Sequence, residues 1–382
     1  MKDHGIDTLV IALDGADLKS LEAQGGIGQF PALARAMRFR GDLPSAPIPQ
    51  TPVAWSSFLC GTETCGIWGW HTVAAPSRLR AVGAHDLPAS WMNWAQPVLL
   101  AGIPLTDDRE GLWGRSIRGL SGLPGHISGS SRPIIRHGSY PRALFQWQSH
   151  TRKWCSTVAD KHRGEKLVLV HCDAIDWHNH RFGNDSATAW NGWKLADELV
   201  GVMVGNFRPS RTVVISDHGS ARVGRVIRIH EALFRRGLSA VCPTPTTRLE
   251  HLLNEPVCCL SDYGALWCRD ESWLEPAEQT LFELGASAVR RYDSFEPSWP
   301  TLVPHFEDGC IALVPPHLYP EFGQGDVVLS ADLPSVLEKH NWVGDHSHTG
   351  LVATSDSAFW AHLVGVSLHR VKDAITHNAA ER

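Results

Sequence analysis

The chain has 382 residues, of which 43% are hydrophobic and 20% are charged, a balance typical of a folded globular protein and not of a disordered one. Its net charge of -5 offers no basic surface for a nucleic-acid polymer or an anionic membrane, and no apolar run is long enough to span a bilayer. At this length the chain forms either one large α/β domain or two smaller ones.

The first residues and the cysteines both bear on the compartment. Because residues 1–7 pass almost directly into a predicted strand, we expect no signal peptide. Nine cysteines, an odd number that includes the adjacent Cys258 and Cys259, indicate reduced thiols. We therefore expect a cytoplasmic protein, and the absence of any Cys-x-x-Cys pair argues against a thiolate zinc finger.

The first predicted strand, residues 7–13, is a continuous apolar run, as expected for a buried parallel strand. It ends at Asp14, whose carboxylate would project from the C-terminal edge of the strand, where open α/β sheets bind ligands. Capping of the following helix explains Asp14 equally well. Residues 30–40 then predict a helix, and the proline-rich residues 41–50 predict a loop.

Residues 48–61 (IPQTPVAWSSFLCG) predict a loop that enters a helix. We expect Thr51 at the N-cap and Pro52 at the first helical position, and Gly61 offers a stop. The Thr51 hydroxyl would then lie where free backbone amides and the positive end of the helix dipole suit a phosphate. Taken alone, the stretch is more simply explained as an ordinary capped helix.

The segment from 62 to 165 is expected to carry a lid. Residues 97–106 predict a buried strand, and residues 143–158 predict a helix. Between them, residues 107–136 are rich in glycine, serine and proline, which predicts a long loop or lid at the edge of an active site.

The strongest metal-binding signal follows the predicted strand at 166–171. Asp176 and His180 are four residues apart, so in a helical turn both side chains fall on one face and can share a metal ion. A hydrogen-bonded loop without metal is the alternative. Three other residues compete for the same role: Asp173, His171 and His178.

A further acid and imidazole stand at the end of another strand. Residues 187–204 predict a helix and residues 211–216 a strand, which ends in Asp217 and His218. One such pair is weak evidence of function. Three acidic strand ends in one chain indicate a common site, because parallel strands end at the same edge of a sheet.

The rest of the chain shows no internal repeat and no hinge, so we expect residues 1–382 to form a single catalytic α/β domain. Two more histidines, His346 and His348, precede the last predicted strand. The remaining predicted elements are a helix at 226–237, a peripheral subdomain at 238–300, strands at 310–314, 326–329 and 351–354, and a closing helix at 366–375.

Four motifs in this order resemble the alkaline phosphatase superfamily, specifically its type I phosphodiesterase/nucleotide pyrophosphatase branch and the bacterial phosphohydrolase/phosphomutase-like group. They are LDG at 13–15, TPVAWSSFLCG at 51–61, DWHNHRFG at 176–183 and SDHG at 216–219. The family's last histidine matches His346, because Gly350 lies at the family spacing from His346 and not from His348. The resemblance implies an alkaline-phosphatase-like central, mainly parallel sheet with helices on both faces, plus lid and subdomain insertions.

The resemblance also implies two divalent metal ions, zinc with manganese as the alternative. Imidazole and carboxylate ligands without thiolate suit such ions in open catalytic sites. It assigns one ion to Asp14, Thr51, Asp217 and His218, and the other to Asp176, His180 and His346. The implied activity is phosphoester hydrolysis of the phosphodiesterase/nucleotide pyrophosphatase type through a phospho-enzyme on Thr51. The alternatives are a phosphomonoesterase, a phosphonate hydrolase or a phosphomutase on the same site, and, in another class, a non-catalytic binding protein of the same fold.

The expected partner is a small-molecule phosphoester, and the sequence leaves the oligomeric state open. A monoester dianion usually needs an arginine clamp, and residues 52–75 contain no lysine or arginine. We therefore expect diesters or pyrophosphate-linked substrates, with the indole of Trp55, Trp68 or Trp70 packing against the second substituent. The alternative is an arginine that reaches in from the lid: Arg115, Arg118 or Arg152.

Overall fold

The fold is taken from a computed structural model. The described residues are 5–63, 71–75, 78–81, 94, 97–103, 110–111, 114–117, 140–259, 261, 263–292, 300–307, 309–311, 316–321, 326–329, 332, 334–340 and 342–380. Most of the predicted lid at 107–136 lies outside these residues, as do Trp68, Trp70 and Arg118. Arg115 lies in a strand whose backbone alone is described.

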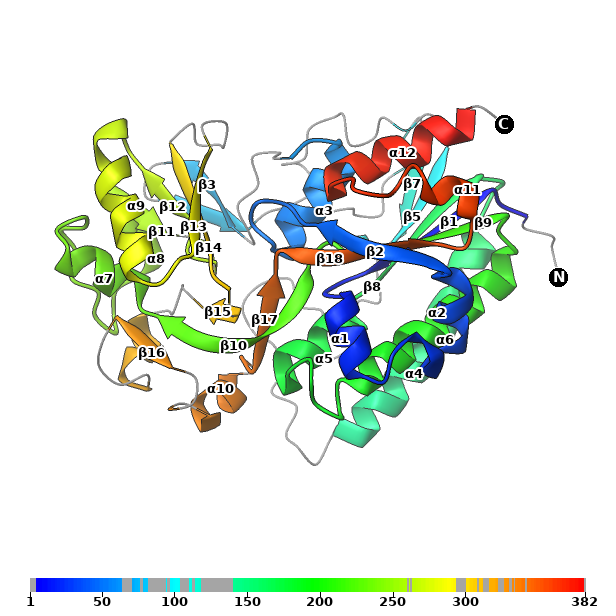
Figure 1. The fold of residues 1–382 in the computed structure, drawn as a ribbon, viewed down its shortest axis with the longest axis horizontal. Coiled ribbons are helices and arrows are strands. Elements are labelled where there is room, and N and C mark those ends of the chain that lie inside the picture. Colours follow the sequence, from blue (N-terminus) through cyan, green and yellow to red (C-terminus); the bar gives the residue numbers. More distant parts are fainter. Residues whose placement is uncertain are drawn as a thin grey trace.

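An eight-stranded sheet forms the centre of the larger lobe (Figure 1). Its strand order is β2 (Phe39–Pro44), β18 (Thr349–Thr354), β9 (Arg211–Ile215), β1 (Thr8–Leu13), β8 (Leu167–Cys172), β5 (Val98–Ala101), β7 (Gly114–Ile117) and β6 (Glu110–Gly111). The five strands from β9 to β7 run parallel, whereas β2, β18 and β6 are antiparallel to their neighbours. The predicted α/β class with a central, mainly parallel sheet is confirmed.

Helices cover both faces of this sheet (Figure 1). One face carries α1 (Leu18–Ala23), α2 (Pro31–Ala36), α4 (Tyr140–Lys161), α5 (Ala174–Phe182) and α6 (Trp190–Phe207), with a 3₁₀ turn at Ile27–Gln29. The other face carries α3 (Thr51–Cys60), α11 (Ser357–Trp360) and α12 (Leu368–Ala380).

The central strands are apolar on both faces because both faces are covered. Along β1, Leu9, Ile11 and Leu13 pack into the core on the α6 side, while Val10 and Ala12 pack into the core on the α3 side. This alternation follows from the two-residue period of a strand. It fixes β1 between two cores and so fixes the position of Asp14 at its end.

A smaller lobe has a core of its own around the antiparallel sheet β11 (Val257–Cys259), β12 (Leu266–Cys268), β14 (Thr301–His305) and β13 (Ala288–Tyr292). The sheet packs against α7 (Ile229–Arg235) and α9 (Leu274–Glu283), with α8 (Leu249–Leu252) and a 3₁₀ turn at Glu271–Trp273 nearby. A two-stranded ribbon, β3 (His71–Ala75) and β4 (Arg78–Ala81), completes the inserted segments.

A long strand connects the two lobes (Figure 1). β10 (Gly219–Ile227) is separated from the end of β9 by three residues, and its first residues pair with β17 (Gly344–Ser347). Further along it pairs with β15 (Gly309–Ile311) and β16 (Val327–Leu329), next to a 3₁₀ helix at Pro316–Glu321 and α10 (Pro334–His340). β10 and β17 therefore join the active-site edge of the main sheet to the smaller lobe.

Three local expectations were wrong. The helix expected at 30–40 ends at Ala36, and residues 39–44 pair with β18 as an edge strand. The helix expected at 226–237 begins only at Ile229, because residues 219–227 form β10. The N-cap of α3 is Gln50, and Thr51 is the first helical residue. In the first two cases, pairing with distant strands outweighs the local pattern.

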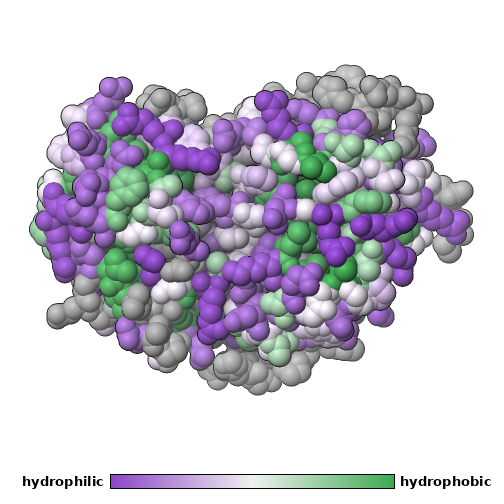
Figure 2. Space-filling view, viewed as in Figure 1, coloured by the Kyte–Doolittle hydropathy of each residue, from purple (hydrophilic) through white to green (hydrophobic). Residues whose placement is uncertain are grey.

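On the face seen in Figure 2, hydrophilic side chains prevail among the described residues, and hydrophobic ones gather in separate groups over both lobes. The described part of the chain contains no helix that is long and apolar enough to cross a membrane.

Candidate active site

The predicted polar residues meet at one edge of the main sheet. β1, β8 and β9 are paired in parallel, with Leu13 opposite Cys172 and Ala12 opposite Ile215, so their C-terminal ends are aligned. Asp14 follows β1, Asp217 and His218 follow β9, and α5 after β8 carries Asp176 and His180.

A glycine turn allows this close approach. Gly15 has φ +68°, a conformation that side chains other than glycine rarely adopt. A Cβ atom on Gly15 would lie 2.8 Å from the Cβ atom of Asp176. The backbone N–H of Asp176 also donates to the carbonyl of Asp14 at 3.2 Å. The turn therefore places the two carboxylates side by side.

The first group of side chains surrounds Thr51. Its hydroxyl donates to Asp14 Oδ1 at 3.3 Å and lies 3.4 Å from His218 Nε2. His218 Nε2 is also 3.1 Å from Asp14 Oδ1 and 3.2 Å from Asp217 Oδ2. Thr51 is the first residue of α3, so its hydroxyl lies at the positive end of the helix.

The second group contains Asp176, His180 and His346. Asp176 Oδ1 lies 3.2 Å from His180 Nε2 on the same face of α5, as the four-residue spacing predicted. His346, on β17, places its Nε2 3.4 Å from Asp176 Oδ1 and 2.8 Å from His180 Nε2. The structure thus brings together residues that are 170 positions apart, Asp176 and His346.

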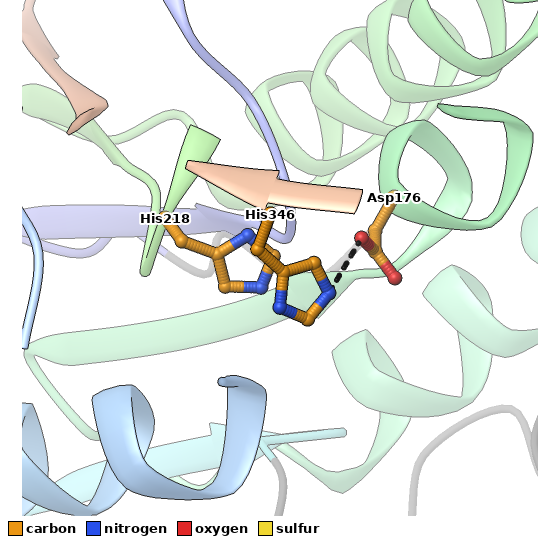
Figure 3. A group of neighbouring side chains, drawn as sticks. All are labelled: Asp176, His218 and His346. Atoms are coloured by element: carbon orange, nitrogen blue, oxygen red, sulfur yellow. Dashed lines mark ion pairs between the residues drawn. The ribbon is translucent and has the colours of Figure 1, made fainter. Parts of the chain in front are cut away.

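The two groups adjoin. The rings of His218 and His346 stack with their centroids 3.7 Å apart. Figure 3 shows both rings beside Asp176, with the contact between His346 and Asp176 drawn as a dashed line. The ligand atoms of these three residues all lie within 4.8 Å of one another. All seven residues assigned by resemblance therefore belong to one cluster.

The orientation of the imidazoles fits bound cations. Each of His180, His218 and His346 has its Nδ1 within hydrogen-bond distance of a backbone carbonyl, at 2.9, 3.0 and 2.6 Å. A carbonyl only accepts, so each Nδ1 carries a proton, and each ring, when neutral, presents the lone pair of Nε2 to the cluster. Such carbonyl–histidine pairs orient metal ligands in proteins.

The carboxylates add further hydrogen-bond acceptors to the Nε2 atoms of these imidazoles. Among the described residues, the buried atoms Asp176 Oδ1 and Asp217 Oδ2 accept no hydrogen bond. Buried acceptors without donors are unfavourable. Lone pairs and carboxylate oxygens that face one another need a cation between them, so the residues present fit divalent metal ions.

The pKa values reflect the same crowding. Burial and the nearby Asp14 carboxylate raise the pKa of Asp217 well above its usual value. Burial lowers the pKa of His218, but the charges of Asp217 and Asp14 outweigh it and raise that pKa to about 10. Burial and the charge of His218 lower the pKa of His346 to about 4. The pKa of His218 is thus raised while that of the adjacent His346 is lowered. Such perturbed pKa values are typical of functional sites.

The competing residues are placed elsewhere. His171 contacts Asp14, with its Nε2 3.1 Å from Asp14 Oδ2. Its ring lies perpendicular to that of Trp55, with ring centroids 5.5 Å apart. His178 is fully buried within α5, where its Nδ1 contacts the carbonyl of Ala174 at 2.6 Å. Asp173 stands at the N-cap position of α5.

Two features of the site were missed or misjudged. Asp345 accepts a hydrogen bond from the backbone of His346 at 2.8 Å and forms a possible ligand group with His180 and His346. Its place beside His346 in the motif was the available signal. Trp55 is fully buried in the core against Phe58, so its indole is not available to a substrate.

A pocket of about 190 Å³ opens beside the cluster. His346 forms one wall, and Tyr263 from the smaller lobe lies nearly parallel to it, with ring centroids 5.8 Å apart. His348 and His305 complete this side, with their rings 4.8 Å apart. His348 therefore lies in the pocket and not among the possible ligands.

The fold is alkaline-phosphatase-like. The family model of the type I phosphodiesterases/nucleotide pyrophosphatases matches residues 125–286. The resemblance read from the motifs is thereby confirmed, and the match agrees with the prediction of an enzyme that acts on phosphoester bonds. A comparison with curated proteins gave no match.

Two solved structures show the same fold at low sequence identity. Phosphonoacetate hydrolase from Sinorhizobium meliloti 1021, in complex with phosphonoformate, has a TM-score of 0.58 and 12% identity, over 98% of this chain and 96% of that chain. Human ectonucleotide pyrophosphatase/phosphodiesterase 5 has a TM-score of 0.51 and 11% identity, over 91% of this chain and 87% of that chain.

Proposed function

We propose that the chain is a metal-dependent phosphoester hydrolase that acts through a phospho-enzyme on Thr51. The observation that carries this proposal is the position of the Thr51 hydroxyl, at the N-terminus of α3 and within 3.4 Å of both Asp14 and His218. A hydroxyl becomes a useful nucleophile when neighbouring groups activate it. The positive end of the helix favours the phosphate that it would attack.

In this proposal one divalent ion is held by Asp14, Thr51, Asp217 and His218, and the other by Asp176, His180 and His346. Their donor set suits zinc, with manganese as the alternative. When bound, such ions supply Lewis-acid stabilisation of phosphoryl oxygens and lower the pKa of coordinated hydroxyls.

The residues of the chain then perform separate tasks. Thr51 Oγ1 forms a bond to phosphorus as the bond to the leaving oxygen breaks, and a water molecule later releases the phosphoryl group from Thr51. The Asp14 carboxylate accepts the hydrogen bond of the attacking hydroxyl. His171 holds the other oxygen of that carboxylate at 3.1 Å, so Asp14 is oriented before substrate binds.

The pocket beside His346 is the proposed place for the organic part of the substrate. It takes the role that the sequence offered to Trp55, because Trp55 is buried in the core. Tyr263 offers an aromatic face there, which suits a second substituent and hence a diester or pyrophosphate-linked substrate. Residues 238–300 would thus contribute to one catalytic unit formed by the whole chain.

A carbon–phosphorus substrate is the second candidate, since the fold is similar to that of a phosphonoacetate hydrolase. Both candidates use the same nucleophile and the same ligand groups. They differ only in the group that leaves and in how the pocket receives it.

The test combines metal analysis with three substrates. We expect two zinc or manganese ions per chain, hydrolysis of bis-(p-nitrophenyl) phosphate with a higher kcat/KM than p-nitrophenyl phosphate, and loss of both activities after chelation. Release of phosphate from phosphonoacetate at a higher kcat/KM than either would favour the second candidate. A protein that binds no divalent ion and hydrolyses none of the three would refute the proposal.

A further inference from the structure

Ser220 lies two residues after His218, at the start of β10, and is 5% exposed. Its hydroxyl donates to the carbonyl of Gly15 at 2.7 Å and accepts from Asn179 Nδ2 at 2.7 Å. Its backbone N–H donates to Asp17 Oδ2 at 2.7 Å. Ser220 is thus a small, buried side chain with every polar group in use.

These contacts reach every segment that carries a proposed carboxylate or imidazole ligand. Gly15 directly follows Asp14, and Asn179 directly precedes His180 on α5. Ser220 shares its own segment with Asp217 and His218, and it is paired across the sheet with His346 on β17. No ligand is itself touched by the hydroxyl in these bonds; the hydroxyl joins the backbones that carry the ligands.

The side chain and the backbone of Ser220 have separable roles. The bond to Asp17, the bond from Asn184 Nδ2 to the Ser220 carbonyl at 3.0 Å, and the pairing with β17 all use backbone atoms. Of the polar atoms of Ser220, only the hydroxyl bridges Gly15 and Asn179. Without it, the remaining direct contact between those two residues is the longer one, 3.4 Å, from Asn179 Nδ2 to the Gly15 carbonyl.

We propose that Ser220 is a positioning residue whose hydroxyl sets the spacing between the two ligand groups, by tying the turn after Asp14 to the helix that carries Asp176 and His180. The inference rests on the metal-binding function proposed above. Metal–ligand distances vary by only a few tenths of an ångström, so a small relaxation between Gly15 and α5 weakens binding without unfolding the chain.

A purely structural role for the hydroxyl predicts a different result. Losing one buried hydrogen-bonded hydroxyl destabilises a fold whether or not metal ligands lie nearby. Thr354 supplies the matched control: its buried hydroxyl also donates to a carbonyl, that of Thr212 at 2.9 Å, and accepts a backbone N–H, that of Asp356 at 3.2 Å. It lies at the end of β18 beside the start of β9, away from the active-site edge.

The experiment compares Ser220→Ala and Thr354→Val with the unaltered chain. Zinc affinity is measured by competition with a chromophoric chelator, and stability is measured by denaturant unfolding of the chelated protein. We expect Ser220→Ala to weaken zinc binding by roughly 10- to 100-fold, the usual effect of removing a group that orients ligands. Thr354→Val should bind zinc within twofold of the unaltered chain, although both variants lose similar stability without metal.

Asn179→Ala removes the other end of the same link and serves if Ser220→Ala does not fold. The double variant should bind zinc no more weakly than the weaker single variant, because both changes break one connection. Unaltered zinc affinity in Ser220→Ala or in Asn179→Ala, with only stability reduced, would overturn the inference alone. An unaltered chain that binds no divalent ion would overturn the proposed function and this inference together.

Discussion

Thr51→Ala separates the chemistry of the candidate site from the stability of the fold. The substitution removes a methyl group and a hydroxyl whose two contacts are long, 3.3 and 3.4 Å. The lost hydrogen bond and buried methyl together contribute about 1–2 kcal/mol. A folded protein of this kind has about 5–15 kcal/mol of stability, so the variant should fold. Because Gln50 is the N-cap, no helix cap is lost.

Catalysis should respond on a different scale. If Thr51 is the covalent nucleophile, Thr51→Ala should lose kcat by roughly 10³-fold or more, since removing a nucleophile forfeits a whole reaction path. Thr51→Val keeps the shape of threonine without its hydroxyl and should be equally inactive, whereas Thr51→Ser keeps the hydroxyl and should retain measurable turnover. The assay is steady-state hydrolysis of bis-(p-nitrophenyl) phosphate at saturating metal, with mass spectrometry of acid-quenched enzyme to find a phosphorylated peptide that contains Thr51.

The result that would refute this reasoning is specific. A folded Thr51→Val variant with kcat within tenfold of the unaltered chain would show that Thr51 is not the nucleophile. The metal cluster would survive that outcome, because its imidazoles and carboxylates are placed by other elements. The hydroxyl would then serve as a ligand or a hydrogen-bond donor to Asp14 only.

Three further outcomes are expected. His346→Ala should weaken zinc binding measured by chelator competition, whereas His348→Ala should change KM more than metal content because His348 lines the pocket; the reverse ranking would mean that the wrong histidine was chosen. Gly15→Ala should lower both zinc affinity and unfolding free energy, the latter by roughly 1–3 kcal/mol, because φ is +68° and the new Cβ meets Asp176; normal binding and stability would contradict the required close approach. Burial lowers the pKa of His230 to about 4, so below an unfolded-state pKa of about 6.5 the unfolded chain binds a proton that the folded chain does not. Stability should therefore fall as pH drops from about 6.5 to 4, by roughly 3 kcal/mol from this residue, and His230→Gln should show a shallower decline in denaturant unfolding; parallel curves for the two proteins would exclude the effect.

The elements that the sequence predicted well are those whose pattern is local. β1, β8 and β9 are short, fully apolar runs, and both faces of each are buried, so composition alone indicates a strand between two layers of helices. Asp176 and His180 lie on one face of α5 because their spacing is that of a helical turn. For such segments the physical cause of the structure is present within ten residues of sequence.

The elements that were missed depend on distant partners. β10 exists because Gly219 to Arg222 pair with residues 344–347, more than 100 positions later, and no local pattern encodes that pairing. β2 likewise pairs with β18 at the other end of the chain. Ser220 gave no signal in the sequence for the same reason, since its hydroxyl acts between segments that are remote in the chain.

The site holds acceptor groups that repel one another, and hydrogen bonds to the surrounding backbone keep them close together. The lone pairs of His180 and His346 face each other at 2.8 Å, and the Asp14 and Asp217 carboxylates share the neighbourhood of His218. In water such groups would turn away and hydrate. Here each imidazole is fixed by a carbonyl, and the turn at Gly15 is fixed by Ser220.

The energy that holds this arrangement comes from elsewhere in the fold. β1, β8 and β9 end at the site, and their apolar side chains pack into cores on both faces of the sheet, which offsets the unfavourable electrostatics at the strand ends. In the proposed function, the cluster is consequently preorganised for divalent cations. Such a cation would satisfy the buried oxygens Asp176 Oδ1 and Asp217 Oδ2, which have no hydrogen-bond partner among the described residues.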